Sequence, residues 1–364
     1  MSPQTLLQKI ISSVLRKFLA VNERINLSFD APENVLVVRQ HNQFGDLLAS
    51  VSLFRAIKEK YPKCRITLIV SPENHYAVEK NEFIDELFIY NKRELFNLAY
   101  WQKVKKTIRQ NFDLAIVPAT VAISKTSCLI AAFSDAKIKI GTKSLDGVKN
   151  NLSFVFHYPV ALNWKKCPDA HVSDFILDIV RPFGITTKNY SSSISYDMDD
   201  ARLAADFLET LNIKKDDYII GFHIGAGKPP NRWPLEKFIK LIYLLNNYHP
   251  IKIYFTGTNA DKDEINYVQS NLGFDAGYFL NKSIPQLTAL IAKSHLFITN
   301  DTGVMHVAGA TRTPQISIFG PTNPFNWAPV GQDKYFQRKS DLISDVDEEV
   351  VFNLSKYILE KRNK

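Results

Sequence analysis

The sequence is poor in cysteine. Its three cysteines, Cys64, Cys128 and Cys167, are odd in number and widely separated, and no Cys-x-x-Cys pair occurs. Neither a disulfide framework nor a zinc knuckle is therefore indicated. This cysteine usage is typical of a protein that works in a reducing, cytosolic compartment.

Long hydrophobic runs and the common cofactor motifs are also missing. No apolar run is long enough to cross a bilayer. The chain has no Gly-x-Gly-x-x-Gly fingerprint, no Walker A motif, no Gly-x-Ser-x-Gly elbow and no His/Asp/Glu cluster with metal-ligand spacing. These absences argue against an NAD-dependent oxidoreductase, and we expect neither a metal ion nor a cofactor.

The chain carries a net charge of +8 over 364 residues. This charge favours an anionic partner. No segment combines dense Lys and Arg with regularly spaced aromatic residues, so we expect no nucleic acid. Phosphorylated small molecules and an anionic membrane surface therefore remain as the candidate anionic partners.

Residues 1–30 are predicted to hold an amphipathic helix. Apolar residues recur at helical spacing from Leu6 to Leu19, and Lys9, Arg16 and Lys17 take other positions. No secretory signal is indicated, because polar residues interrupt the apolar core. Two interpretations stay open: the stripe packs on the body of the protein, or it lies in the headgroup region of an anionic membrane.

Alternating strands and helices predict α/β architecture in two domains. In the first, residues 31–190, we expect strands at Val35–Arg39, Arg65–Val70, Leu87–Tyr90 and Asp113–Val117, with helices at Asp46–Tyr61, Lys80–Phe88 and Leu95–Asn111. A Ser-rich stretch, Tyr190–Asp199, is the predicted linker.

The pattern restarts in residues 200–343. We expect strands at Tyr218–His223, Ile251–Thr256, Tyr278–Leu280, Leu296–Ile298 and Gln315–Phe319, with helices at Leu235–Asn247, Asp261–Leu272, Pro285–Lys293 and Val304–Ala310. Residues 344–364 form a closing helix, with Ser344 and Asp347 as a capping box. Two doubly wound parallel sheets predict a cleft between their carboxyl ends, where open α/β folds bind ligands.

Gly45-Asp46 follows the first predicted strand of the first domain. Gly45 permits a tight turn, and Asp46 would be the first or second residue of the following helix. Two roles are compatible with this position. Asp46 caps the helix, or it is a general base that takes a proton from an attacking hydroxyl at the rim of the cleft.

A glycine-rich loop, Gly225-Ala226-Gly227, follows the first strand of the second domain and leads to Lys228 and Arg232. Such turns let backbone amides approach phosphate closely, and Arg pairs with phosphate oxygens. The alternative is a solvated basic loop. Asp261, after the next strand, either accepts hydrogen bonds from ribose hydroxyls or caps the helix that follows.

A strand, a turn and a helix start follow each other between Leu296 and Ala310, in the sequence Leu-Phe-Ile-Thr-Asn-Asp-Thr-Gly-Val-Met-His-Val-Ala-Gly-Ala. We expect Gly303 to adopt a positive φ and the first helical amides to bind an anion. His306 would donate to a phosphate. The alternative is an ordinary connection, with Asp301 as a cap and His306 satisfied in the core.

With these motifs in view, the chain resembles the glycosyltransferase family that contains the lipopolysaccharide heptosyltransferases. Three segments, spread over most of the chain in the family's order, carry the resemblance. They are Val35–Lys60 with Tyr61-Pro62, Gly225–Glu236 with Arg232-Trp233-Pro234, and Asn300–His306 through Phe319-Gly320-Pro321-Thr322-Asn323-Pro324 and Trp327.

The resemblance implies a GT-B fold and an inverting, metal-independent glycosyltransferase. It implies a sugar nucleotide donor, ADP-heptose before others, and a saccharide or lipid-linked saccharide acceptor of the lipopolysaccharide core, at the cytoplasmic face of the inner membrane. Asp46 becomes the base, and the implied donor-binding residues are Gly225, Ala226, Arg232, Asp261, Asp301, Thr302, Gly303 and His306.

The chain departs from the family pattern at two places. The stretch from Arg39 to Gly45 is one residue longer than the usual spacing, and Ser52 stands where the family usually has proline. Two alternatives to heptosyl transfer stay open: a GT-B transferase with another sugar nucleotide, and a non-catalytic ligand-binding or assembly protein that kept the fold.

Overall fold

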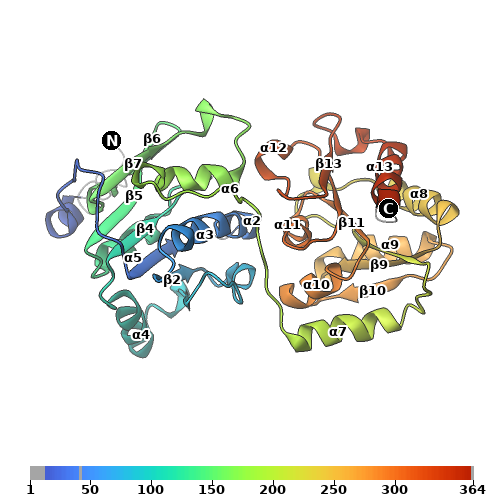
Figure 1. The fold of residues 1–364 in the computed structure, drawn as a ribbon, viewed down its shortest axis with the longest axis horizontal. Coiled ribbons are helices and arrows are strands. Elements are labelled where there is room, and N and C mark those ends of the chain that lie inside the picture. The colour runs from blue at the N-terminus through green and yellow to red at the C-terminus, as the bar shows by residue number, and fades with distance from the viewer. Residues whose placement is uncertain (1–12, 41–42, 362–364) are drawn as a thin grey trace. The chain divides into compact units, whose positions relative to one another are not determined.

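The computed structural model describes residues 13–40 and 43–361. The chain divides into two compact units, residues 1–190 and residues 191–364 (Figure 1), which we call the first and second units. Residues 189–197, around this boundary, form no helix or strand.

The first unit is built on a seven-stranded sheet with the order β3-β2-β1-β4-β5-β6, and β7 pairs with β5. All of the described pairings in it are parallel except that of β5 with β6. The strands are β1 (Asn34–Arg39), β2 (Arg65–Val70), β3 (Glu86–Ile89), β4 (Leu114–Val117), β5 (Ile138–Leu145), β6 (Val148–Lys149) and β7 (Tyr158–Leu162). The helices are α2 (Phe44–Ala49), α3 (Val51–Lys60), α4 (Leu98–Ile108), α5 (Lys125–Phe133) and α6 (Val172–Phe175).

Strand β1 shows why this sheet is buried on both faces. Leu36 and Val38 pack into a cluster with Val104 of α4 and Ala131 of α5, and Val35 is equally inaccessible to solvent on the opposite face. A continuous run of apolar residues is typical of a parallel strand that helices cover on both sides. The strand order changes direction between β1 and β4, which marks the switch point of the sheet.

The second unit holds a six-stranded parallel sheet with the order β10-β9-β8-β11-β12-β13. Its strands are β8 (Tyr218–His223), β9 (Ile251–Gly257), β10 (Gly277–Leu280), β11 (Leu296–Asn300), β12 (Gln315–Ile318) and β13 (Lys334–Gln337). Its helices are α7 (Met198–Glu209), α8 (Leu235–Tyr248), α9 (Lys262–Asn271), α10 (Ile284–Ile291), α11 (Gly303–Gly309), α12 (Pro324–Trp327) and α13 (Glu348–Lys361). This is the Rossmann strand order, with its switch point between β8 and β11.

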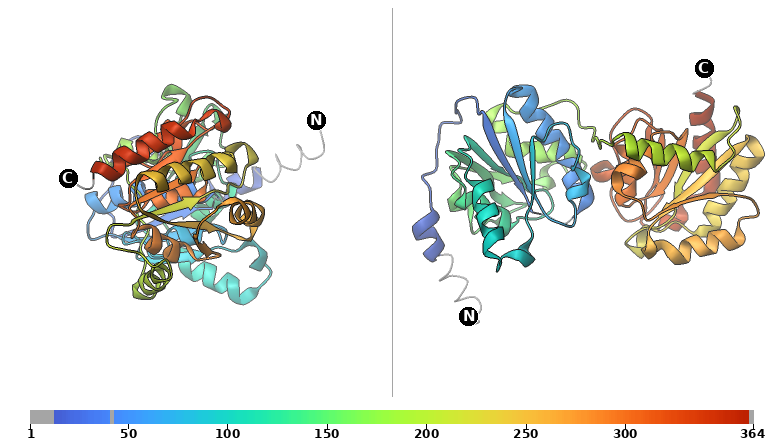
Figure 2. Two further views of the ribbon diagram at one scale, coloured as in Figure 1. Left: turned by 90° about the vertical axis from the view of Figure 1, so that its right-hand side faces the viewer. Right: turned by 90° about the horizontal axis from the view of Figure 1, so that it is seen from below.

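Helices cover both faces of the second sheet. On one face α8 and α13 lie together over a core that includes Phe222, Phe255 and Ile298, and on the other α7 packs against α10 (Figures 1 and 2). Gly221 of β8 is required by this packing, because a Cβ there would lie 2.4 Å from the Tyr254 ring. The layers therefore fix the carboxyl ends of β8 and β11 beside each other.

Several predicted elements differ in the structure. The helix predicted at Asp46–Tyr61 is broken at Ser50 into α2 and α3. The helix predicted at Lys80–Phe88 is wrong: this stretch forms turns and then β3. The helix predicted at Leu95–Asn111 is shorter and begins at the cap Asn97, whose side chain accepts from Ala99 and Tyr100.

The closing helix has a different cap from the predicted one. It begins at Glu348, and the Asp347 carboxylate accepts a hydrogen bond from the Glu349 amide at 2.9 Å. Ser344 lies in a preceding 3-10 turn, and its carbonyl accepts from Lys237. The predicted Ser344–Asp347 box is therefore wrong, and Asp347 caps the helix alone.

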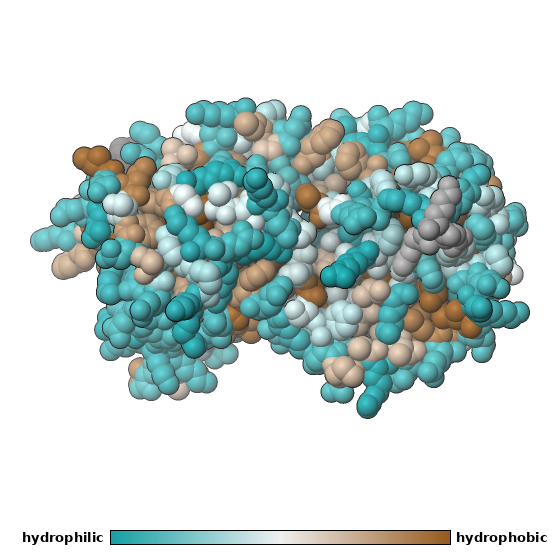
Figure 3. Space-filling model, viewed as in Figure 1, coloured by the Kyte–Doolittle hydropathy of each residue, from teal (hydrophilic) through white to brown (hydrophobic). Residues whose placement is uncertain are grey.

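The amphipathic stripe lies partly outside the described residues, which exclude 1–12. Residues 13–19 are helical. Leu15 and Leu19 pack against the first unit's core, whereas Val14 and Phe18 stay exposed. Among the described residues no helix combines the length and apolarity needed to cross a membrane. Hydrophilic residues predominate on the face drawn in Figure 3, with apolar patches between them.

Candidate active site

Asp46 lies in the first turn of α2, at the carboxyl end of β1 in the first unit, as its third residue. Its side chain is fully buried. One carboxylate oxygen forms an ion pair with Arg39, the last residue of β1, and the other accepts a short hydrogen bond from Thr120. The Arg39 guanidinium also donates to the Thr120 hydroxyl at 2.7 Å, which closes a buried triangle.

This triangle, Arg39–Asp46–Thr120, occupies the switch point of the first sheet, because Arg39 ends β1 and Thr120 follows β4. Burying a carboxylate is unfavourable unless it is paired, and the ion pair with Arg39 offsets that cost and fixes the position of the Asp46 side chain. The N-cap residue of α2, Gln43, makes no side-chain cap bond, and the contacts described for the Asp46 carboxylate are those of this triangle.

Two serines, Ser50 and Ser52, form hydrogen bonds close to Asp46 in the sequence. The Ser50 hydroxyl donates to the Asp46 carbonyl at 3.1 Å and accepts from Arg39. Ser52, where the resembling family has proline, donates to the Ser173 carbonyl at 2.6 Å. The departure from the family pattern therefore adds a polar link between α3 and α6.

In the second unit, the glycine-rich loop after β8 lies against Asp261. A Cβ on Gly225 would approach the Asp261 carboxylate oxygen to 1.9 Å, whereas a Cβ on Gly227 would meet nothing within 4 Å. The other Asp261 oxygen accepts from the amide and hydroxyl of Thr258, in a capping box. Asp261 thus completes the capping box of the 3-10 turn Asn259–Asp261, and its side chain makes no cap bond to α9, so the predicted cap of the following helix is not formed.

Arg232 is half-exposed and is held at two points. Its Nε donates to the Ala226 carbonyl at 2.8 Å, and its Nη1 pairs with Glu264 of α9 at 2.6 Å. These contacts tie the glycine-rich loop to α9. They direct the guanidinium along the loop at the carboxyl end of β8.

Asp301 follows β11 and is joined to the same loop. The Asn231 amide donates to its carboxylate at 2.8 Å. Burial raises the pKa of the Asp301 carboxyl, while a hydrogen bond from Thr322 and the charge of Lys228 act in the opposite direction. Burial thus favours the neutral form of this carboxyl, which does not repel an approaching anion.

Asn300, the last residue of β11, pins the loops together. Its amide donates to the Ile224 carbonyl at 2.8 Å, and its oxygen accepts from the Trp233 amide at 3.1 Å. Asn300 is fully buried, so these bonds satisfy groups that water cannot reach. The loops after β8 and β11 therefore form one rigid edge at the switch point.

Thr302 and Gly303 begin α11, and His306 lies one turn on. The positive φ predicted for Gly303 is wrong: it is the first helical residue, and the left-handed glycines among the described residues are Gly147, Gly184 and Gly331. His306 is half-buried, and its ring meets Trp327 edge-on at 6.5 Å between centroids.

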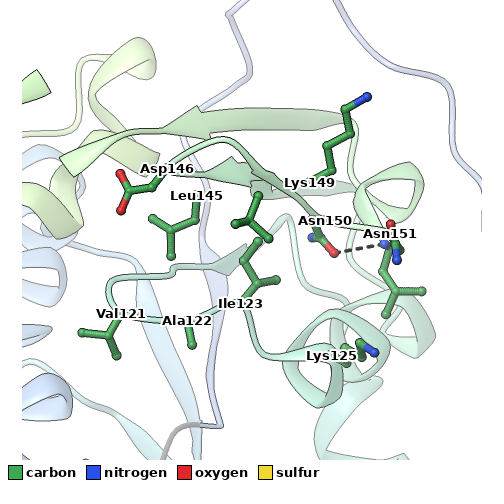
Figure 4. A pocket seen from close by; sticks show the side chains of 11 residues that line it. Val121, Ala122, Ile123, Lys125, Leu145, Asp146, Lys149, Asn150 and Asn151 are labelled. Atoms are coloured by element: carbon green, nitrogen blue, oxygen red, sulfur yellow. Dashed lines mark hydrogen bonds between the residues drawn. The ribbon is translucent and has the colours of Figure 1, made fainter. Parts of the chain in front are cut away.

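A pocket of about 510 Å³ opens in the first unit (Figure 4). The loop after β4 contributes Val121, Ala122 and Ile123, and the β5–β6 hairpin contributes Leu145 and Asp146. Figure 4 shows Lys125 and Lys149 at its edge. Neither lysine forms an ion pair with another described residue.

The structure thus gathers most of the predicted residues at two edges, one in each unit. Gly225, Ala226, Arg232, Asp261 and Asp301 share the switch point of the second sheet, and Asp46 lies at that of the first. No group of three or more His, Cys, Asp or Glu side chains among the described residues is placed to hold a metal ion.

Comparisons with known proteins agree with this architecture. The sequence profile of glycosyltransferase family 9 (heptosyltransferase) matches residues 101–344. The lipooligosaccharide heptosyltransferase 2 of Haemophilus ducreyi is 27% identical over 326 residues, which cover 82% of this chain and 86% of that protein. The chain belongs to glycosyltransferase family 9.

Solved structures show the same fold for this glycosyltransferase. A glycosyl transferase family 9 protein from Veillonella parvula superposes with a TM-score of 0.80 at 19% identity, covering 92% of this chain and 100% of that one. Escherichia coli ADP-heptose lps heptosyltransferase II gives a TM-score of 0.71 at 17% identity, covering 91% and 100%. The predicted family and the predicted fold class, two Rossmann-like units of the GT-B type, are confirmed.

Sequence reasoning about this glycosyltransferase missed three residues that organise its edges. Thr120, Asn231 and Asn300 act through contacts with residues 70 or more positions away, or with backbone carbonyls of another loop. A position at or shortly after a strand end could have indicated Thr120 and Asn300, whereas Asn231 lies further along the loop after β8 and carries no such signal. The sequence places Arg39 at the end of its strand but does not indicate its ion pair with Asp46.

Proposed function

We propose that this glycosyltransferase transfers heptose from ADP-heptose to a saccharide acceptor of the lipopolysaccharide core, with inversion and without a metal ion. Family membership is the observation that carries the proposal. The names of the relatives, which match along most of their length, support the donor and the acceptor class. The proposed place of action is the cytoplasmic face of the inner membrane.

The donor diphosphate would bind at the switch point of the second sheet. Arg232 and Lys228 supply positive charge there, and the amides at Thr302 and Gly303 begin a helix at the same edge. Protonation of Asp301, which burial favours, would remove its repulsion of the diphosphate. The ribose of the donor would approach Asp261, and the phosphate oxygens would approach His306. As the glycosidic bond to the diphosphate breaks, Arg232 and Lys228 would stabilise the negative charge on the leaving group.

The acceptor hydroxyl would be activated at the first unit's triangle. Asp46 is enclosed by Arg39 and Thr120, so the hydroxyl reaches the carboxylate by displacing the neutral partner, Thr120. The hydroxyl oxygen then attacks the anomeric carbon, its proton passes to Asp46, and the nucleoside diphosphate leaves from the opposite face. One direct displacement inverts the anomeric centre.

The pocket of Figure 4 is the proposed acceptor site. Much of its lining is apolar, as the carbon–hydrogen faces of sugar rings require, and Lys125 and Lys149 at its edge form no ion pair with another residue that the structure describes. Asn150, also in its lining, is held by bonds to the Thr142 carbonyl and the Leu152 amide. This combination favours a saccharide that carries phosphate or carboxylate groups.

A panel of sugar nucleotides tests the proposal. Purified protein is incubated with ADP-heptose, other ADP-sugars and UDP-sugars, together with a lipopolysaccharide-core oligosaccharide. We expect transfer from ADP-heptose, unchanged by a chelator. Preferential transfer from another donor would correct the donor, and the absence of transfer from every donor would contradict the proposal.

A further inference from the structure

Large apolar side chains gather at the surface of α4 and α5 in the first unit. Phe96, Leu98 and Trp101 are 102%, 75% and 45% exposed, and Phe133 at the end of α5 is 53% exposed. Leu98 and Trp101 lie three residues apart on one side of α4, and the Trp101 indole donates to the Leu95 carbonyl, which fixes the loop that carries Phe96. Contiguous exposed apolar groups usually mark an interaction site.

A groove of about 280 Å³ lies between the two helices. Trp101 of α4 and Phe133 of α5 line it, and Val104, Ile108 and Ile130 line it as buried residues. The groove is therefore the apolar centre of this patch and not an isolated cavity.

The segment that carries most of this patch is rich in basic residues. From Lys92 to Arg109 the sequence has six cations and one acid, Glu94, a local net charge of +5. The cations are Lys92, Arg93, Lys103, Lys105, Lys106 and Arg109, all exposed. None of the six forms a salt bridge with any residue that the structure describes.

We propose that this α4–α5 surface docks the enzyme on an anionic phospholipid bilayer. Protruding aromatic and aliphatic side chains enter the headgroup region, and lysine stems reach the same depth while their ammonium groups meet lipid phosphates. A neutral protein partner would leave the six cations without counter-charges. This surface does not include the amphipathic stripe from Leu6 to Leu19.

The position of α5 links the docking surface to the acceptor pocket, and this step rests on the proposed function. The first residue of α5, Lys125, borders the proposed acceptor pocket, while Thr126, Leu129 and Phe133 of the same helix line the groove. A bilayer at the groove therefore lies one helix away from the pocket. A lipid-linked saccharide would reach that pocket without leaving the membrane.

Vesicle binding by the full chain tests the docking. Flotation uses vesicles of phosphatidylglycerol with phosphatidylcholine, and of phosphatidylcholine alone. Each cation near an anionic surface contributes about fivefold, so K105E/R109E, which changes the two cations on the same side of α4 as Leu98 and Trp101, should weaken binding to the anionic vesicles by about 30-fold or more. F96S/L98S should weaken binding too, and the matched control M198S/K293E in the second unit should bind like the parent.

Two further measurements separate the alternatives. Brominated lipids should quench the parent's tryptophan fluorescence and quench W101F much less. All docking variants should transfer to a water-soluble oligosaccharide at the parent rate, a readout that is independent of vesicles. Variants that bind vesicles like the parent would overturn the docking. The docking would also be overturned if the variants lost vesicle binding only because they unfold, or if their effect were instead to dissociate a dimer that forms without lipid.

Discussion

The buried triangle in the first unit makes a strong prediction about stability. Replacing Arg39 with methionine removes the buried cation that pairs with the Asp46 carboxylate. Removing one partner of a buried ion pair costs roughly 3–5 kcal/mol. For a unit of this size each kcal/mol lowers the melting temperature by about 2–4 °C. We therefore expect Arg39→Met to lower the melting temperature of the first unit by about 6–20 °C, measured by calorimetry.

The double variant separates pairing from packing. Arg39→Met/Asp46→Leu removes both charges, and it should recover most of the lost stability, because an apolar pair of similar volume is often neutral or stabilising. Lys137→Met, which breaks the exposed ion pair with Asp113, is the control and should leave the melting temperature almost unchanged. A single variant as stable as the parent, or a double variant as unstable as both singles combined, would refute the reasoning.

This result also governs the test of Asp46 as the base. Asp46→Asn leaves the Arg39 guanidinium buried without its anion, so part of any lost activity would come from unfolding. On protein shown to be folded by circular dichroism, we expect kcat to fall by about 10²–10⁴-fold with nearly unchanged donor binding. Near-normal turnover would remove Asp46 from the chemistry.

The second unit gives three further predictions. Gly225→Ala should disrupt the donor loop and weaken ADP binding, since its Cβ would lie 1.9 Å from Asp261, whereas Gly227→Ala should bind like the parent; equal affinities would contradict the close approach. Arg232→Ala should weaken ADP binding by about 1.5–3 kcal/mol in calorimetry, the scale of hydrogen bonds to charged groups, and unchanged affinity would take Arg232 out of the donor site. Because burial raises the pKa of Asp301, ADP affinity should rise as the pH falls through that pKa, and Asp301→Asn should flatten this pH profile. The same shift stabilises the fold at a pH below the ordinary aspartate pKa, and this contribution to stability is lost as the pH rises through the raised pKa.

Much of the fold was readable because its strands are short apolar runs that end at turn residues. The predicted strands at Val35–Arg39, Arg65–Val70 and Tyr218–His223 match β1, β2 and β8 closely. Strand β5 has lysine, glycine, threonine and serine among its eight residues, so it carries no clear apolar signal. The predicted helix at Lys80–Phe88 failed because β3 takes the end of that stretch as an edge strand.

The candidate site was readable only where its residues stand next to strand ends. Gly225 and Asp301 closely follow β8 and β11, Arg232 lies later in the loop after β8, and a Rossmann strand order brings these two strands together. The partners of these residues were not readable, since Thr120 meets Asp46 across 74 positions and Asn231 meets Asp301 across 70. Such pairs are set by the sheet order and not by local spacing.

The most direct test of the central claim is the anomeric configuration of the sugar that this enzyme transfers. Purified protein is given ADP-heptose and a core oligosaccharide, and the product is examined by nuclear magnetic resonance. The account predicts one heptose on the acceptor, with the configuration opposite to that of the donor. A retained configuration, or free heptose without a transferred product, would contradict it.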